Sequence, residues 1–157
     1  LSKHGELEDS VHLAYWPDFP ADWDDETLRE EYSTLFKIRY AVRKRLEELR
    51  SNDQINRNEE AHVSISVQSD AVRDVLDRRQ GTLADLFKVA QVELLEEVNE
   101  EMSADATVEG LSISVGRSEF SKCERCWNHR KSVGVREDHP ELCERCYSAV
   151  KPMLEAE

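Results

Sequence analysis

The sequence predicts an α+β protein in three parts: the tail helix of a helical bundle, a small mixed α/β lobe, and a C-terminal lobe containing four cysteines. A long charged segment with apolar residues at spacings of three, four and seven predicts the helix. Segments in which apolar and polar residues alternate predict strands. Two C-x-x-C pairs predict a zinc-knuckle lobe with four cysteine ligands. The expected boundaries are residues 1–52, 58–117 and 118–157.

Residues 1–20 are expected to form an irregular lead-in, because Pro17 and Pro20 block a helix there. A helix is expected over residues 25–50. Its narrow apolar stripe consists of Leu28, Tyr32, Leu35, Val42, Leu46 and Leu49. One helix cannot bury such a stripe alone, so we expect partner helices in a bundle. The basic residues of this helix are interpreted as a solvated face rather than an RNA-contact face.

A polar linker over residues 51–58 leads into the middle lobe. Residues 61–68 alternate between apolar and polar, which predicts a half-buried strand with its serines facing solvent. A helix is expected over residues 71–79, ended by Gly81, with another turn over residues 82–87. Further strands are expected over residues 89–98 and 108–115, and a terminal helix over residues 144–154.

The strongest chemical signal is the set of four cysteines: Cys123, Cys126, Cys143 and Cys146. Two residues within each pair let both sulfurs turn toward one point, so the two pairs offer four thiolates to one tetrahedral metal. The spacer between the pairs has the length typical of zinc sites. Four cysteine ligands leave no open coordination position, which favours a structural zinc ion over a catalytic one.

Other interpretations of the cysteines remain open from sequence alone. Two disulfides would require an oxidising compartment, and no signal peptide is recognisable at the start of the sequence. A redox pair would explain one C-x-x-C but not two, and a rubredoxin-like iron site is a further alternative. His129 and His139 lie in the spacer and could replace a cysteine, although four thiolates already suffice.

The composition limits the other functions. The net charge of −13 argues against a general electrostatic grip on nucleic acid, which depends on cations. No Gly-rich phosphate loop and no Ser/His/Asp set is recognisable, so we expect no catalytic residues in this chain. Nothing approaches transmembrane length, and a cytoplasmic location without membrane association is expected. The first residue, Leu1, suggests a fragment of a longer protein.

A binding surface is the remaining candidate. Trp127 directly follows the first cysteine pair, with Arg125, Arg130 and Lys131 close by in sequence. An aromatic ring beside cations on a metal-held loop suits stacking on an unpaired base while the cations meet phosphate. The alternative is that Trp127 packs over the knuckle as a miniature core, because small metal lobes have little other apolar mass.

The motifs KCERCW (residues 122–127) and HPELCERC (residues 139–146) resemble the C-terminal zinc finger of bacterial-type isoleucyl-tRNA synthetases. Upstream, DSVHLAYWP (residues 9–17) resembles the segment that enters the last helix of that family's anticodon-binding bundle. The main rival is the related finger of formamidopyrimidine-DNA glycosylases, which holds DNA. A third possibility is a purely structural zinc lobe.

The synthetase resemblance implies the C-terminal piece of an isoleucine–tRNA ligase, which uses ATP to join isoleucine to tRNA-Ile. The family's nucleotide signatures are absent from this sequence, so ATP and Mg²⁺ would bind only in a separate catalytic domain. The resemblance implies tRNA-Ile and the remaining synthetase domains as partners of a monomeric protein. It also implicates the tryptophan after the second cysteine, here Trp127, in tRNA contact.

Overall fold

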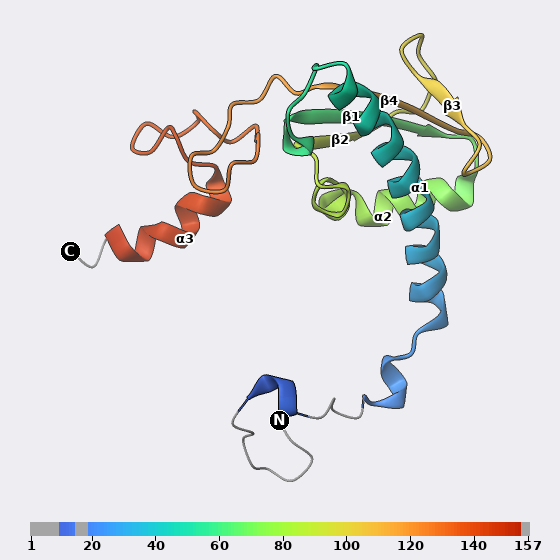
Figure 1. Ribbon diagram of the computed structural model, residues 1–157, viewed down its shortest axis with the longest axis horizontal. Coiled ribbons are helices and arrows are strands. Elements are labelled where there is room, and N and C mark those ends of the chain that lie inside the picture. The colour runs from blue at the N-terminus through green and yellow to red at the C-terminus, as the bar shows by residue number, and fades with distance from the viewer. Residues whose placement is uncertain (1–9, 15–18, 155–157) are drawn as a thin grey trace. The chain divides into compact units, whose positions relative to one another are not determined.

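The computed structural model describes residues 10–14 and 19–154 of the chain. The order of the longer elements is α1 (Glu26–Ser51), β1 (Ala61–Val67), α2 (Asp70–Phe87), β2 (Gln91–Leu94), β3 (Ser103–Asp105), β4 (Leu111–Arg117) and α3 (Glu144–Leu154) (Figure 1). Single 3-10 turns occur at Val11–Leu13, Ala21–Trp23 and Asn58–Glu60. The chain divides within α1 into two compact units, Leu1–Tyr32 and Ser33–Glu157. The predicted α+β class is confirmed.

Most of the expected lead-in, including Pro17, lies outside the described residues. Helix α1 forms where the apolar stripe predicts it. Its first turn is capped by Asp25, whose carboxylate accepts a hydrogen bond from the Leu28 amide at 3.0 Å. Leu28, the first residue of the predicted stripe, is exposed. Burial is confined to the later turns, which belong to the unit that contains the sheet; the buried residues are Leu35, Ile38, Ala41, Val42 and Leu46.

The four strands form one mixed sheet in the order β2-β1-β4-β3 (Figure 1). Strand β1 runs parallel to β2, with α2 as the crossover, and antiparallel to β4. Ile65 of β1 is paired with Leu94 on one side and Ile113 on the other. Helix α2 packs against β1 and β2, and its Leu76 and Phe87 are fully buried.

The prediction that β1 is only half-buried is wrong. Ser64 and Ser66, expected to face solvent, are 8% and 3% exposed. They lie opposite serines of β4, and Ser66 pairs with Ser112, which is itself buried. Strand β1 lies inside the sheet, and both of its faces are buried: Val63 and Ile65 on one, Ser64 and Ser66 on the other.

The other boundaries differ locally. Helix α2 begins after Ser69, whose hydroxyl accepts from the Val72 amide, and it runs through Gly81 without a break. It ends at Phe87 and is followed by the C-cap Lys88, which adopts the left-handed conformation. The expected strand over residues 89–98 is reduced to β2, β3 was not predicted, and β4 begins later than expected. The terminal helix α3 has the predicted bounds.

The first and last residues of the middle lobe lie next to each other in the sheet. The first residue of β1, Ala61, pairs with the last residue of β4, Arg117, and the Ser118 amide donates to the Glu60 carbonyl at 2.7 Å. The cysteine-containing segment follows directly after this point. Within the described part of the chain, no helix is both long and apolar enough to cross a membrane. The three predicted domain boundaries remain a prediction.

Candidate metal centre

Two tight turns position the cysteines. In the first, the Cys123 amide donates to the Asn128 carbonyl at 3.0 Å, and the Trp127 amide donates back to the Cys123 carbonyl at 2.8 Å. In the second, Cys143 immediately precedes α3 and Cys146 lies in its first turn. The Tyr147 amide donates to the Cys143 carbonyl at 2.9 Å, so the helix itself fixes the spacing of this pair.

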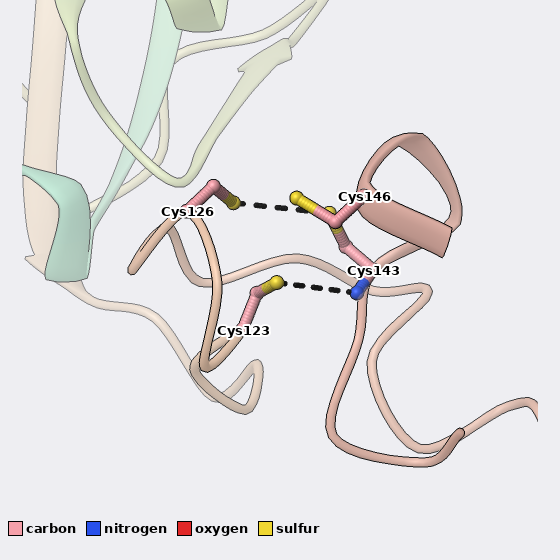
Figure 2. A group of neighbouring side chains, drawn as sticks. All are labelled: Cys123, Cys126, Cys143 and Cys146. Carbon is pink, nitrogen blue, oxygen red and sulfur yellow. Dashed lines mark hydrogen bonds between the residues drawn. The ribbon is translucent and has the colours of Figure 1, made fainter. Parts of the chain in front are cut away.

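The four sulfur atoms converge on one point, as Figure 2 shows. They all lie within 4.8 Å of one another. Cys123, Cys143 and Cys146 are buried and Cys126 is partly buried. Tetrahedral zinc with Zn–S bonds of about 2.3 Å requires sulfurs about 3.8 Å apart. The Sγ atoms of Cys126 and Cys143 are 3.8 Å apart, so this donor set fits a structural Zn²⁺ ion.

The electrostatics favour a cation in this cluster. Burial alone would raise the pKa of Cys123, but backbone amides of Cys126, Cys143 and Arg125 stabilise its thiolate and lower the pKa to about 6. One of these bonds, from the Cys143 amide to Cys123 Sγ, measures 3.3 Å and is drawn in Figure 2. Burial, together with hydrogen bonds to neighbouring thiols, raises the pKa of Cys143 to about 12. Without a metal, thiols such as Cys143 stay protonated at neutral pH. A bound cation would stabilise their thiolate forms.

Two arginines balance the negative charge of the cluster. The Arg125 guanidinium lies 3.6 Å from Cys146 Sγ. The pKa of Arg145 is raised, chiefly by a side-chain hydrogen bond with Cys126. Four thiolates around Zn²⁺ would carry a net charge of about −2, and these two cations offset it. Arg125, predicted from sequence as a phosphate contact, therefore lies against a candidate metal ligand.

The spacer histidines lie outside the cluster. His129 Nδ1 is hydrogen-bonded to the Phe120 carbonyl at 2.6 Å, and His139 Nδ1 contacts the Glu141 carboxylate at 3.3 Å. Across the described residues, the four cysteines are the single group placed to hold a metal ion. Because four thiolates fill a tetrahedral site, no position remains for an activated water or a substrate.

A separate contact fastens the spacer to α3. The Arg136 guanidinium lies 3.6 Å from the centre of the Tyr147 ring and forms two hydrogen bonds with Asp138, at 2.9 and 3.0 Å. The hydrogen bond from Arg136 lowers the pKa of Asp138 to about 2. Because Tyr147 follows Cys146 in α3, this contact holds the spacer beside the second knuckle.

Trp127 is not the apolar filling of this lobe. The residues packed against the buried cysteines are Cys126, Val133 and Leu142. Trp127 is 55% exposed, and its indole N–H donates to the Glu124 carbonyl at 3.0 Å. Its backbone φ of 62° lies in the left-handed region, which bulky residues rarely adopt. The knuckle therefore presents the ring to solvent in a fixed orientation.

The remaining predicted binding residues are placed differently from one another. The Arg130 guanidinium is 2.7 Å from the Asp85 carboxylate of α2, whereas Lys131 is exposed. Two cations that the sequence did not single out lie over the Trp127 ring: Arg57 at 5.4 Å and Lys122 at 5.9 Å. Lys122 directly precedes Cys123, so its place in the sequence could have indicated that it lies near Trp127. Arg57 lies far upstream, and nothing in the sequence connects it to Trp127.

Comparison with known proteins also indicates a zinc finger at the four cysteines. Residues 120–149 match the family described as the zinc finger found in FPG and IleRS. The isoleucine–tRNA ligase of Syntrophotalea carbinolica is 36% identical over 146 residues, which are 93% of this chain and 16% of that protein. The Geobacter sulfurreducens ligase is 36% identical over 92% of this chain and 16% of its own length. The Gloeobacter violaceus ligase is 38% identical over 90% of this chain and 14% of its own length. The chain thus spans about a sixth of the relatives it matches.

Proposed function

We propose a role in tRNA recognition for this chain, which matches isoleucine–tRNA ligases along nine-tenths of its length and whose residues 120–149 carry the zinc finger found in FPG and IleRS. The chain would be the C-terminal, zinc-binding part of a ligase that charges tRNA-Ile with isoleucine. Similarity to ligases over more than nine-tenths of the chain, far beyond the finger, argues against a DNA-glycosylase-like protein. ATP and Mg²⁺ would act in other parts of that ligase.

In this proposal Cys123, Cys126, Cys143 and Cys146 are the ligands of a structural zinc ion. Zinc supplies rigidity, because four bonds replace the large apolar core that so small a lobe cannot build. The chain's own residues carry the recognition. Trp127 offers an aromatic face for an unpaired base, and Lys131, close to it in sequence, supplies an exposed cation.

The observation that carries the proposal is the exposure of Trp127 on a metal-held turn. An indole ring in water loses the burial energy that a core position would give, and its left-handed backbone adds strain. Binding of a partner to the ring would explain why the protein tolerates both costs. The other proposed partners are the remaining ligase domains, in a monomeric, cytoplasmic enzyme.

The test is Trp127→Ala in the complete ligase. Loss of one stacked base should weaken tRNA-Ile binding about 5- to 150-fold. Formation of the isoleucyl-adenylate, measured by ATP–pyrophosphate exchange, should stay unchanged, because the adenylate site lies elsewhere.

Val135→Ala is the matched control, since Val135 is an exposed apolar side chain of the same lobe. This variant should leave both activities unchanged. Unaltered aminoacylation kinetics in Trp127→Ala would refute the proposed contact and leave a purely structural zinc lobe as the better interpretation.

A further inference from the structure

Two cations from distant parts of the sequence meet at Trp127. Arg57 lies in the segment between α1 and β1, and Lys122 immediately precedes Cys123. The Arg57 guanidinium carbon is 5.4 Å and the Lys122 ammonium nitrogen 5.9 Å from the centre of the indole ring. Both distances fall within the range of attraction between a cation and an aromatic ring. Two positive charges therefore lie over the exposed tryptophan.

Both cations are available for a new partner. Arg57 Nε lies 3.8 Å from the Glu59 carboxylate, and its side chain is 51% exposed. Lys122 Nζ lies 3.6 Å from the Glu124 carboxylate, and its side chain is 46% exposed. Exposed ion pairs of this kind contribute little free energy, so a phosphate can replace the carboxylate at small cost.

Arg130 and Arg125 already have partners within the protein. Arg130 makes a shorter ion pair with Asp85, at 2.7 Å, and its side chain is only 26% exposed. Arg125 lies against Cys146 Sγ. Arg130 is paired with a carboxylate and the Arg125 charge offsets the thiolates, so both are less suited to bind an external anion.

Resting on the tRNA-binding role proposed above, we propose that Arg57 and Lys122 bind the phosphates that flank a base stacked on Trp127. An aromatic ring with exposed cations beside it has the composition of sites that take single-stranded RNA. On binding, the two long side chains would move from over the ring to the flanking phosphates, and the base would take their place on the ring. The occupant would be an unpaired nucleotide of tRNA. Arg57 would then extend the binding surface of the zinc lobe to the segment that leads into the sheet.

The experiment measures tRNA-Ile affinity of the zinc-loaded, complete ligase as a function of salt concentration. Neutralising one phosphate releases counterions, so log K changes with log[salt] with a slope of about −0.7 to −0.9 per contact. Arg57→Gln should therefore reduce the slope by about 0.7 to 0.9 and weaken binding about 5- to 8-fold at about 0.1 M salt. Arg57→Lys should retain the slope, because it retains the charge.

Lys122→Gln provides an independent measurement and should cause a similar loss. Arg29→Gln is the control for general charge, since Arg29 is an exposed arginine of the other compact unit. Zinc content and circular dichroism of each variant identify any loss of folding.

The outcomes separate the two proposals. If Trp127→Ala weakens binding but Arg57→Gln and Lys122→Gln behave like Arg29→Gln, the phosphate contacts are refuted and the tRNA role stands. If Trp127→Ala binds tRNA-Ile as tightly as the original protein, the tRNA role itself is refuted. A slope that falls for Arg57→Gln and is restored by Arg57→Lys supports the inference, because a merely structural arginine would not alter the counterion count.

Discussion

Trp127 combines two features that stability alone does not explain. The residue is 55% exposed and its backbone has a φ of 62°. For residues other than glycine, the left-handed conformation costs roughly 1–2 kcal/mol. The turn requires it, because the Trp127 amide closes the knuckle on the Cys123 carbonyl. Glycine would satisfy the same turn without strain, so the indole ring is retained despite its cost.

A pair of substitutions at this position separates strain from recognition. Trp127→Gly and Trp127→Ala both remove the ring, so both should lose tRNA binding to the same extent. Trp127→Gly should be more stable than Trp127→Ala by about 1 kcal/mol, because alanine keeps the left-handed strain. Zinc-loaded proteins unfolded in guanidinium chloride provide the comparison. Equal stability of the two variants would mean that the turn relaxes to another conformation.

At this scale the sequence predicted the metal centre better than its surroundings. The spacing of Cys123 and Cys126 reflects a local turn, and local turns can be read from sequence. The partners of the nearby cations depend on the tertiary fold instead. Arg130 reaches Asp85 of α2, and Arg57 reaches Trp127, across long stretches of chain. No local pattern could have revealed either contact.

Helix α2 shows how tertiary packing overrides a local signal. Gly81 was expected to end a helix, yet the helix continues to Phe87. Leu76, Leu83 and Phe87 are fully buried at helical spacings of seven and four on either side of the glycine. Their burial outweighs the helix penalty of one glycine, which is about 1 kcal/mol.

Two glycines therefore make opposite predictions. Gly81→Ala should stabilise the protein by about 0.5–1 kcal/mol, because Gly81 is helical and an added Cβ meets no atom within 4 Å. Gly110→Ala should destabilise it by at least about 1 kcal/mol, because Gly110 has a φ of +71°. Its added Cβ would also lie 2.8 Å from the Gln68 Cβ. Chemical denaturation followed by circular dichroism measures both, and a loss of stability in Gly81→Ala would contradict this account of α2.

The alternation of apolar and polar residues predicted the position of β1 but not the burial of both of its faces. Val63 and Ile65 are buried as the pattern indicates. Ser64 and Ser66 on the opposite face of this inner strand are buried as well. Serine is small enough to fit at a buried position. Because serine is polar, the sequence pattern did not indicate that these positions are buried. Whether the second face of a strand is covered depends on the tertiary fold, so the pattern of a single segment could not reveal it.

The α/β part and the cysteine lobe are stabilised in different ways. The α/β part has an ordinary apolar core that includes Leu76, Leu83 and Ile65. Among the described residues of the cysteine lobe, the buried cluster consists of its thiols with Val133 and Leu142 packed against them. So small an apolar cluster cannot offset the conformational entropy of the lobe without a metal.

Removal of zinc should therefore unfold one part and leave the other. After chelation, amides of residues 121–147 should exchange rapidly with solvent, while those of β1 and α2 should stay protected. Hydrogen exchange read by mass spectrometry gives both signals in one sample. Simultaneous loss of protection in β1 would show that the lobes are one cooperative unit.

Acid should have the same effect as chelation. Zinc binds thiolates, so protons compete with the metal and affinity falls as the pH falls. In the metal-free cluster, the pKa of Cys123 is lowered to about 6, so this thiol is already deprotonated at about pH 7. Below about pH 6 it binds a proton too, and the fall in affinity should become steeper. Competition with a chromogenic chelator across about pH 5–8 measures the slope, and a pH-independent affinity would contradict thiolate ligation.

The closure of the middle lobe, where Ala61 pairs with Arg117 and Ser118 bonds to Glu60, has an evolutionary consequence. A module whose two ends lie side by side can be gained or lost without rerouting the rest of the polypeptide. Residues 61–117 have the connectivity of such an insertion between α1 and the cysteine lobe. A lineage could therefore enlarge, shrink or delete this module while keeping the path from the helix to the finger.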